Sequence, residues 1–160
     1  MAKIRKSWQE KLNDAKGCPK VEPITGKMSQ RWGAGTVVIP APLEVDGYMR
    51  QVPAGKVTTI NQIREALARK HGATIGCPIT TGIFAWIAAY ASDERAFAGE
   101  KDITPYWRTL RSGGELNPKY PGGIEEQAAR LQEEGHIIEM GRGGKTARVK
   151  DFEARLSDLK

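Results

Sequence analysis

The chain has 160 residues, a formal net charge of +6 and a sequence pI of about 9.4. This length fits one domain of about 100 to 150 residues with extensions. No apolar run approaches the ~20 residues that a membrane-spanning helix needs, and residues 1–6 lead into polar sequence without a hydrophobic signal region. We therefore expect a cytoplasmic or nucleoid-associated protein that does not contact membranes.

Basic side chains gather in the first segment, and residues 1–42 are predicted to be a basic N-terminal arm with a wrapping loop. Eight basic side chains lie within residues 1–35, against three acidic ones; the basic ones are Lys3, Arg5, Lys6, Lys11, Lys16, Lys20, Lys27 and Arg31. Such cations can contact DNA phosphates and release counterions. The same charges also suit a solvated tail, and charge alone leaves both interpretations open.

Two elements are predicted within this arm. Residues 7–15 should form a short helix, because Trp8 and Leu12 are four residues apart and share a helical face. Gly and Pro recur from residue 17 to residue 42, which indicates a loop with residues 36–39 as its one strand candidate.

A helix-turn-helix pattern follows. Residues 43–51 should form a helix that ends before Pro53, since a residue preceding proline avoids the α region. Thr59 and Gln62 have the spacing of a capping box, which predicts a helix to about His71. Pro78 suits a first helical position, so the second helix of the motif should cover about residues 79–91.

This second helix is unusually apolar for a DNA reader. Thr80 and Thr81, near its start, are the residues best placed to reach a phosphate or a thymine methyl group. The apolar side chains also fit a buried core helix, and periodicity alone favours that interpretation; they are Ile79, Ile83, Phe84, Trp86, Ile87 and Tyr90. Residues 91–103 then form a longer charged connection that we expect to be exposed.

The most distinctive sequence begins with Pro105-Tyr106-Trp107-Arg108, before a Gly-rich turn and Tyr120-Pro121-Gly122-Gly123-Ile124. Upstream stands Val52-Pro53-Ala54-Gly55-Lys56-Val57-Thr58-Thr59. In this order the motifs resemble those of the alkylguanine-DNA alkyltransferases, whose signature is Pro-Cys-His-Arg followed by Tyr-x-Gly-Gly-Leu. The resemblance covers roughly residues 43–135. It implies a mainly α fold with short β-strands, a winged helix-turn-helix domain over residues 43–135, and double-stranded DNA, alkylated or not, as the partner.

The resemblance also shows what is missing for alkyl transfer. The family's cysteine, histidine and glutamate positions are occupied by Tyr106, Trp107 and Ala128. Transfer needs a thiolate with a neighbouring base, and a tyrosine hydroxyl with a pKa near ~10 does not replace it. Cys77 at a helix N-terminus is a weak substitute candidate, because no base is evident beside it. The chain is therefore predicted to be a non-enzymatic, alkyltransferase-like relative.

Two further positions concern damage recognition. Ile60 replaces the aromatic residue that helps rotate a damaged nucleotide, and Gly82, or its neighbour Thr81 or Ile83, replaces an intercalating arginine. The resemblance therefore predicts duplex binding but gives less support to base flipping, which inserted side chains normally assist. Tyr106 and Trp107 either line a lesion pocket and stack on an unpaired base, or face inward and plug it; their size favours the plug.

The resemblance and the helix positions together give a set of candidate DNA-binding residues. These are Thr58, Thr59, Asn61, Thr80, Thr81, Arg108 and Arg111. The two arginines suit either phosphates or structural carbonyl groups. His71 and His136 with two scattered cysteines lack the spacing of a zinc site, so no metal or cofactor is predicted.

Residues 136–160 are predicted to form a β-hairpin and a short closing helix packed on the same domain. The hairpin turn is basic and suits a wing on DNA, or an ordinary solvated hairpin; its cations are Arg142, Lys145, Arg148 and Lys150. Two functions remain open. One is non-catalytic recognition of alkylated or distorted DNA, which is then passed to a repair-pathway protein; the other is a winged-helix protein-interaction module.

Overall fold

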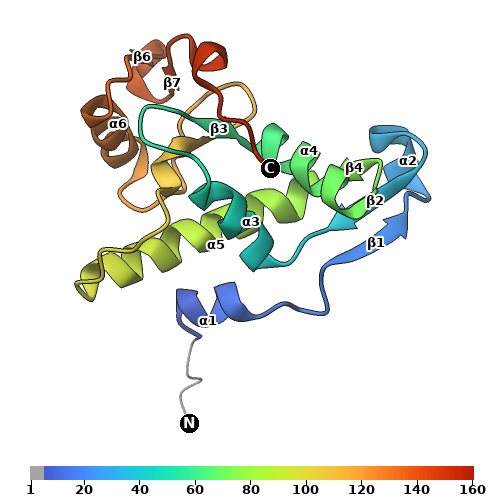
Figure 1. The fold of residues 1–160 in the computed structure, drawn as a ribbon. Coiled ribbons are helices and arrows are strands. Elements are labelled where there is room, and N and C mark those ends of the chain that lie inside the picture. Colours follow the sequence, from blue (N-terminus) through green and yellow to red (C-terminus); the bar gives the residue numbers. More distant parts are fainter. Residues whose placement is uncertain (1–5) are drawn as a thin grey trace.

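The computed structural model describes residues 6–160 and shows a mainly helical protein with short strands (Figure 1). Lys3 and Arg5 of the predicted basic arm lie outside the described residues. The helices are α1 (Trp8–Asn13), α2 (Lys27–Trp32), α3 (Pro42–Arg50), α4 (Ile60–His71), α5 (Pro78–Phe97) and α6 (Gly123–Glu133). The strands are β1 (Lys20–Pro23), β2 (Thr36–Ile39), β3 (Thr58–Thr59), β4 (Ile75–Gly76), β5 (Thr109–Leu110), β6 (Ile138–Met140) and β7 (Ala147–Val149).

Helix α4 has the predicted bounds because both of its ends carry capping signals. The Thr59 side chain accepts a hydrogen bond from the backbone N–H of Gln62 (3.4 Å). Gly72 ends the helix with a left-handed conformation (φ 64°), which glycine adopts without steric cost. The apolar face of α4, with Ile63 and Leu67, is fully buried.

Helix α5 begins at Pro78 as predicted but continues to Phe97, six residues beyond the expected end. The prediction of an exposed, charged connection over residues 91–103 was therefore wrong for its first half, which is helical and largely buried or half-buried. No glycine or proline interrupts the sequence between Gly82 and Gly99, so nothing stops the helix earlier. The rest of the connection is exposed at residues 98–102 but anchored at Thr104, whose hydroxyl donates to the carboxylate of Asp46 (2.6 Å).

Strand β2 lies where it was predicted, but residues 20–32, predicted to be loop, form β1 and the short helix α2. β1 pairs antiparallel with β2, and β2 pairs parallel with β4, the two-residue strand in the turn between α4 and α5. The arm therefore extends this turn into a three-stranded sheet. The strands of this sheet pair with segments that are distant in the chain, and local sequence patterns do not reveal such pairing.

Helix α1 confirms the predicted N-terminal helix and packs on α5. The Trp8 ring stacks on Tyr90 (centroids 4.7 Å apart) and meets Trp86 edge to face (5.0 Å). The carboxylate of Glu94 accepts hydrogen bonds from the backbone N–H groups of Trp8 and Gln9, both at 3.0 Å. One face of α5, at Trp86, Tyr90 and Glu94, is thus covered by α1.

Two large apolar cores and a third, small cluster around Cys77 hold the described part of the chain together. The larger lies among α1, α3, α4 and α5 and includes Met49, Leu67 and Tyr106. The smaller lies under the C-terminal hairpin and includes Val57, Leu131 and Val149. The predicted hairpin is confirmed as β6 and β7, but the predicted closing helix is a single 3-10 turn, η3 (Phe152–Arg155).

The C-terminal segment after η3 is held by backbone bonds, which explains why it does not continue as a helix. The Val57 N–H donates to the carbonyl of Arg155 (2.9 Å), and the Ser157 N–H donates to the carbonyl of Val57 (2.8 Å). None of the helices in the described part of the chain is long and apolar enough to cross a bilayer.

Candidate nucleic-acid interface

The start of α5 exposes large apolar side chains. Ile79 is 52% exposed and Ile83 is 44% exposed, although both are large apolar side chains. They lie one helical turn apart, and Gly82 lies beside Ile83 on the same helix. A Cβ atom at Gly82 would meet no heavy atom within 4 Å, so nothing in the described chain covers this surface. The result is an open apolar face about one turn long.

The four candidate threonines turn inward. Thr58, Thr59 and Thr81 are at most 1% exposed, and the Thr80 hydroxyl is also shielded from solvent. The Thr59 side chain is used to cap α4, and Thr58 pairs with Thr109 in the β3–β5 ladder. These positions argue against direct phosphate contact by their hydroxyl groups. Sequence reasoning placed them near the helix starts correctly but did not reveal which face each one takes.

Asn61 joins three segments of the motif. Its side-chain oxygen Oδ1 accepts from the Arg64 guanidinium (3.1 Å) and from the Ser112 hydroxyl (3.2 Å). Arg64 Nε also donates to the carbonyl of Gly76 (2.8 Å), directly before α5. The first turn of α4, the turn before α5 and the Gly-rich loop are therefore fixed to one another. Asn61 remains half-buried at this junction.

Arg108 has a structural position. Its Nε atom donates to the carboxylate of Glu134 (2.9 Å), and Nη1 donates to the carbonyl of Val52 (2.8 Å). Both charged side chains are only about one-sixth exposed (16% and 15%). Of the two roles considered for Arg108, the structure favours the contact with a structural carbonyl, and the guanidinium is not free for a phosphate.

Arg111 differs from Arg108. Its backbone pairs with Glu115, while its side chain is exposed and forms no ion pair with residues 6–160. Of the predicted DNA-binding residues, Arg111 is thus the cation that remains available to a polyanion.

Tyr106 occupies the interior where the resemblance suggested a reaction centre. It is 2% exposed, and its ring meets those of Trp107 and Tyr120 edge to face, with centroids 5.4 and 5.5 Å apart. Its hydroxyl donates to the carbonyl of Pro121 (3.4 Å). Burial raises the pKa of Tyr106 above its usual 10, so the phenol stays neutral at neutral pH. Of the two orientations considered, Tyr106 takes the inward one.

Trp107 lies beside it and is half-buried. The Arg130 guanidinium lies over its ring, 4.6 Å from the centroid, and the Arg108 guanidinium lies 5.4 Å away. The indole N–H is shielded from solvent and has no acceptor in the described chain. Ala128, at the glutamate position of the resemblance, packs against the smaller core together with Trp107. No carboxylate relay exists at these three positions.

Gln127 is a residue that the sequence interpretation missed. It is completely buried; its amide nitrogen donates to the carbonyl of Trp107 (3.1 Å), and its oxygen accepts from the backbone N–H of Asn117 (2.8 Å). It therefore positions the stretch that contains Tyr106. A signal was present, because Gln127 lies on the same helical stripe as Ile124 and Leu131, where a polar residue needs buried partners.

Cys77 is the N-terminal capping residue of α5 and is 5% exposed. It packs with Ile24 and Val37 in a small apolar cluster, and its side chain makes no capping hydrogen bond. Its apolar surroundings contain no base. Within residues 6–160, no group of three His, Cys, Asp or Glu side chains is placed to hold a metal ion.

The turn of the C-terminal hairpin supplies exposed cations. Arg142, Lys145 and Arg148 are all exposed, and none of them forms an ion pair within residues 6–160. The hairpin is anchored to the body, since the Leu116 N–H donates to the carbonyl of Ala147 (2.8 Å). This is the geometry of a wing with a charged tip.

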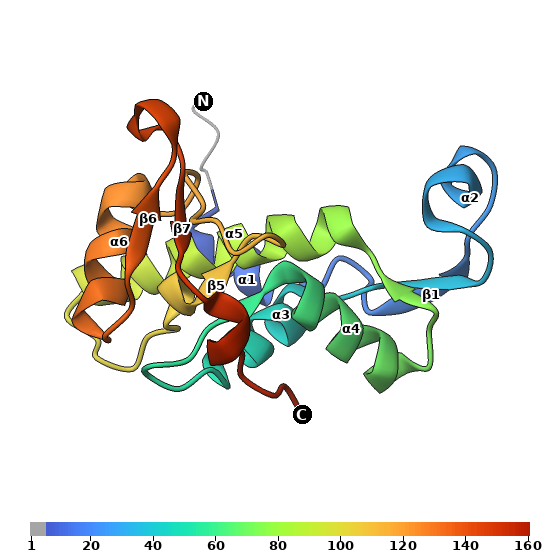
Figure 2. The same cartoon turned by 90° about the horizontal axis from the view of Figure 1, so that it is seen from above.

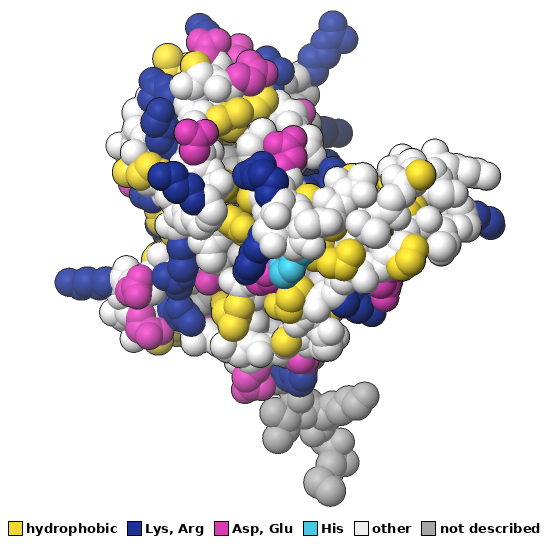
Figure 3. All heavy atoms as spheres, turned by 45° about the vertical axis from the view of Figure 1, so that its right-hand side comes forward, with side chains coloured by type: hydrophobic (Ala, Val, Ile, Leu, Met, Phe, Trp, Pro, Cys, Tyr) yellow, Lys and Arg dark blue, Asp and Glu magenta, His cyan; other side chains and the backbone are white. Residues whose placement is uncertain are grey.

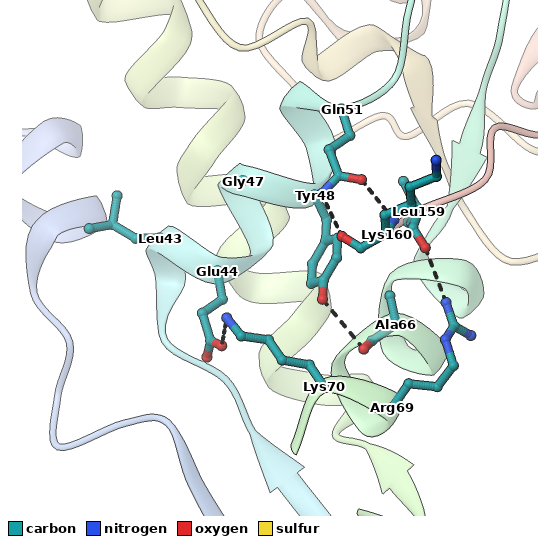
Figure 4. Close-up of a pocket in the computed structure, with 10 residues that line it drawn as sticks. All are labelled: Leu43, Glu44, Gly47, Tyr48, Gln51, Ala66, Arg69, Lys70, Leu159 and Lys160. Carbon is teal, nitrogen blue, oxygen red and sulfur yellow. Dashed lines mark hydrogen bonds and ion pairs between the residues drawn. The ribbon is translucent and has the colours of Figure 1, made fainter. Parts of the chain in front are cut away.

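A separate open pocket lies on the face formed by α3, α4 and the C-terminal segment (Figure 4). Its volume is about 720 Å³. Gln51 and the backbone of Lys160 exchange hydrogen bonds at its rim (3.0 and 2.9 Å). Glu44 Oε2 lies 2.7 Å from both Lys70 and His71, which neutralises much of the charge there. Figure 3 shows Lys and Arg mixed with Asp, Glu and hydrophobic side chains on this side of the molecule, rather than a continuous basic surface.

The α4–turn–α5 unit with the β6–β7 hairpin defines a winged helix-turn-helix protein with the fold of the alkyltransferase-like proteins. The structure is similar to the crystal structure of S. pombe Atl1 in complex with damaged DNA containing O6-carboxymethylguanine. The TM-score is 0.51 at 20% sequence identity, and the match covers 72% of this chain and 93% of Atl1.

Sequence comparisons alone do not reveal this likeness. No protein-family model matches the chain, and no curated protein matches its sequence. The fold expected from the motifs, mainly α with short strands and a winged helix-turn-helix, is confirmed by the structural likeness.

Proposed function

We propose that this protein binds duplex DNA without alkyl transfer, and that it favours alkylated or otherwise distorted duplexes. The observation that carries the proposal is the uncovered start of α5, where Ile79 and Ile83 are exposed in a helix-turn-helix. Support comes from the fold shared with S. pombe Atl1, whose crystal structure contains damaged DNA. A basic hairpin and Arg111 supply cations for phosphates.

The apolar character of α5 explains the expected preference for distorted DNA. Isoleucine side chains cannot read base edges through hydrogen bonds. Apolar side chains on DNA-binding proteins instead wedge between base steps and kink the duplex. This deformation costs less where a lesion or mismatch already weakens stacking. Recognition by shape is therefore more consistent with Ile79 and Ile83 than recognition of sequence.

The buried residues at the family's reaction centre lack the groups that alkyl transfer needs. Tyr106 is buried and neutral, its neighbour Trp107 is no base, and Ala128 carries no carboxylate. Cys77 is buried among apolar side chains. An extruded base would also have to displace the Tyr106 ring, so we propose that a lesion is recognised within the deformed duplex. We further propose that the protein passes the damaged duplex to a repair protein, in the cytoplasm or nucleoid.

Fluorescence anisotropy with three duplexes of one sequence tests the proposal: unmodified, with one O6-carboxymethylguanine, and with one G·T mismatch. We expect binding to all three at low salt, tighter for the modified and mismatched duplexes, and an unchanged protein mass after incubation with the modified one. Equal affinities would remove the preference for distortion. No detectable binding would favour the protein-interaction module, and an added alkyl mass would contradict the non-enzymatic role.

A further inference from the structure

The β1–α2–β2 segment (Lys20–Ile39) stands out from the body of the molecule beside the turn of the helix-turn-helix (Figures 1 and 3). It is fixed at its base. The Cys77 N–H donates to the carbonyl of Val38 (2.9 Å), and the Thr74 N–H donates to the carbonyl of Thr36 (3.1 Å). Since Cys77 caps α5, the position of this projection is coupled directly to the start of α5.

Helix α2, at the outer end of the projection, packs through one side chain, Trp32, which is partly buried against the small apolar cluster that contains Cys77. None of its six residues is buried. Its N-cap is Gly26, which makes no side-chain capping bond, and the first turn carries no acidic residue. A helix this short is marginal without tertiary contacts. The other five residues of α2, at positions 27–31, are exposed.

The charges on α2 are also uncompensated. Lys27 and Arg31 are four residues apart, which places them on one helical face. Like charges at this spacing destabilise an isolated helix. Neither side chain forms an ion pair within residues 6–160. An external anion would relieve this repulsion.

The projection lies on the side of α5 to which the hairpin also points. Figure 2 shows α2 and the turn between β6 and β7 rising on the same side of α5, at opposite ends of the molecule. The hairpin turn carries exposed Arg142 and Lys145. Two cationic projections therefore stand on one side of α5, at opposite ends of the molecule, and the exposed start of this helix faces DNA in the proposed function.

We propose that α2 is a second wing, in which Lys27 and Arg31 contact the phosphate backbone of the duplex bound at α5. This inference rests on the proposed function and adds a contact surface to it. Duplex DNA is the occupant that fits, because it presents a regular line of anions long enough to reach both projections. The exposed Met28 (39%) and Val21 (44%) lie on the same projection and can pack against sugar groups.

The slope of log affinity against log salt concentration tests this second wing. Each lost phosphate contact lowers the magnitude of the slope by about 0.9, so Lys27→Gln/Arg31→Gln should lower it by about 1.8. The matched control is Lys56→Gln/Lys160→Gln, which removes two exposed lysines outside the projection. We expect the control to keep the wild-type slope. Circular dichroism should show both variants folded, since no substituted side chain is buried.

The outcomes are distinct. If the wild type binds duplex DNA and the α2 variant keeps its slope, α2 is not a wing, while the proposed function stands. If both double variants lose the same slope, the effect is one of net charge and the inference fails. If the wild type does not bind duplex DNA at low salt, the second wing and the proposed function both fail.

Discussion

Arg108 and Arg111 are three residues apart in sequence but have opposite surroundings. We expect Arg108→Ala to lower the free energy of unfolding by about 1.5 to 3 kcal/mol, because charged hydrogen bonds to Glu134 and Val52 are lost. Arg111→Ala should change stability by less than about 0.5 kcal/mol, as exposed substitutions do, and should weaken duplex binding. Urea denaturation and anisotropy on both variants measure the two effects. Unchanged stability of Arg108→Ala would contradict its structural role.

Restoring a cysteine should not restore transfer. In Tyr106→Cys the new thiol would be buried beside Trp107 and Tyr120, neither of which is a base that could form a thiolate. The lost ring leaves a cavity, and changes of this size cost about 3 to 5 kcal/mol. Mass spectrometry after incubation with alkylguanine DNA should show no added alkyl group. Stoichiometric transfer by this variant would contradict our view of the site.

The buried side chain of His136 predicts a pH dependence of stability. Burial lowers the pKa of His136 below its usual 6.5, and Arg155 adds to the effect. The folded state therefore binds fewer protons than the unfolded state, so the contribution of His136 is complete above about pH 6.5 and is lost as pH falls towards the folded pKa. The urea concentration at the unfolding midpoint should therefore decrease when the pH is lowered from 7.5 to 5.5. His136→Gln should show a smaller fall, and an equal fall would assign the effect to other groups.

Sequence patterns predicted where the candidate residues lie along the chain better than which way their side chains point. The order of motifs indicated which positions lack transfer chemistry, and the greater size of Tyr106 favoured its inward position. The threonines at the helix starts were placed correctly along the chain, yet their hydroxyls point inward. A helix start has both a solvent face and a core face, and Thr is small and polar enough to occupy either one.

At the scale of elements, local signals account for the correct predictions. Thr59 and Gly72 define α4 because capping depends on adjacent residues. Helix α2 carries no such signal, and the pairing of β1 with β2 and of β2 with β4 depends on contacts between distant segments. The extra turns of α5 were missed because the charged residues after Ala91 were interpreted as a connection, although Glu94, Arg95 and Ala96 are good helix formers.

The docking of α1 on α5 gives an element-scale prediction. Trp8→Ala removes a half-buried ring that stacks on Tyr90 and meets Trp86, and we expect a loss of about 1.5 to 3 kcal/mol of stability. Duplex affinity should be kept at temperatures where the variant is folded, because the start of α5 is not covered by α1. Thermal denaturation and anisotropy measure these two properties. A large loss of affinity in the folded variant would place α1 within the DNA interface.

At the scale of the whole molecule, the winged helix-turn-helix was predicted from the order of its motifs. The placement of the basic arm was not, because charge alone does not distinguish a solvated tail from a folded projection. The structure orders residues 6–42 into α1 on one side of α5 and a β-sheet extension at its start. Neither α1 nor the sheet extension covers Ile79 and Ile83 at the start of α5.

The most direct test of the account is the duplex affinity of Ile83→Asp compared with Leu43→Asp. Ile83 is 44% exposed on α5 and Leu43 is 49% exposed on α3, and each variant gains one carboxylate. A carboxylate facing DNA meets like charge, which costs several kcal/mol. We predict that Ile83→Asp lowers affinity by about tenfold or more while Leu43→Asp changes it little. Equal affinities of the two variants would contradict a DNA interface at the start of α5.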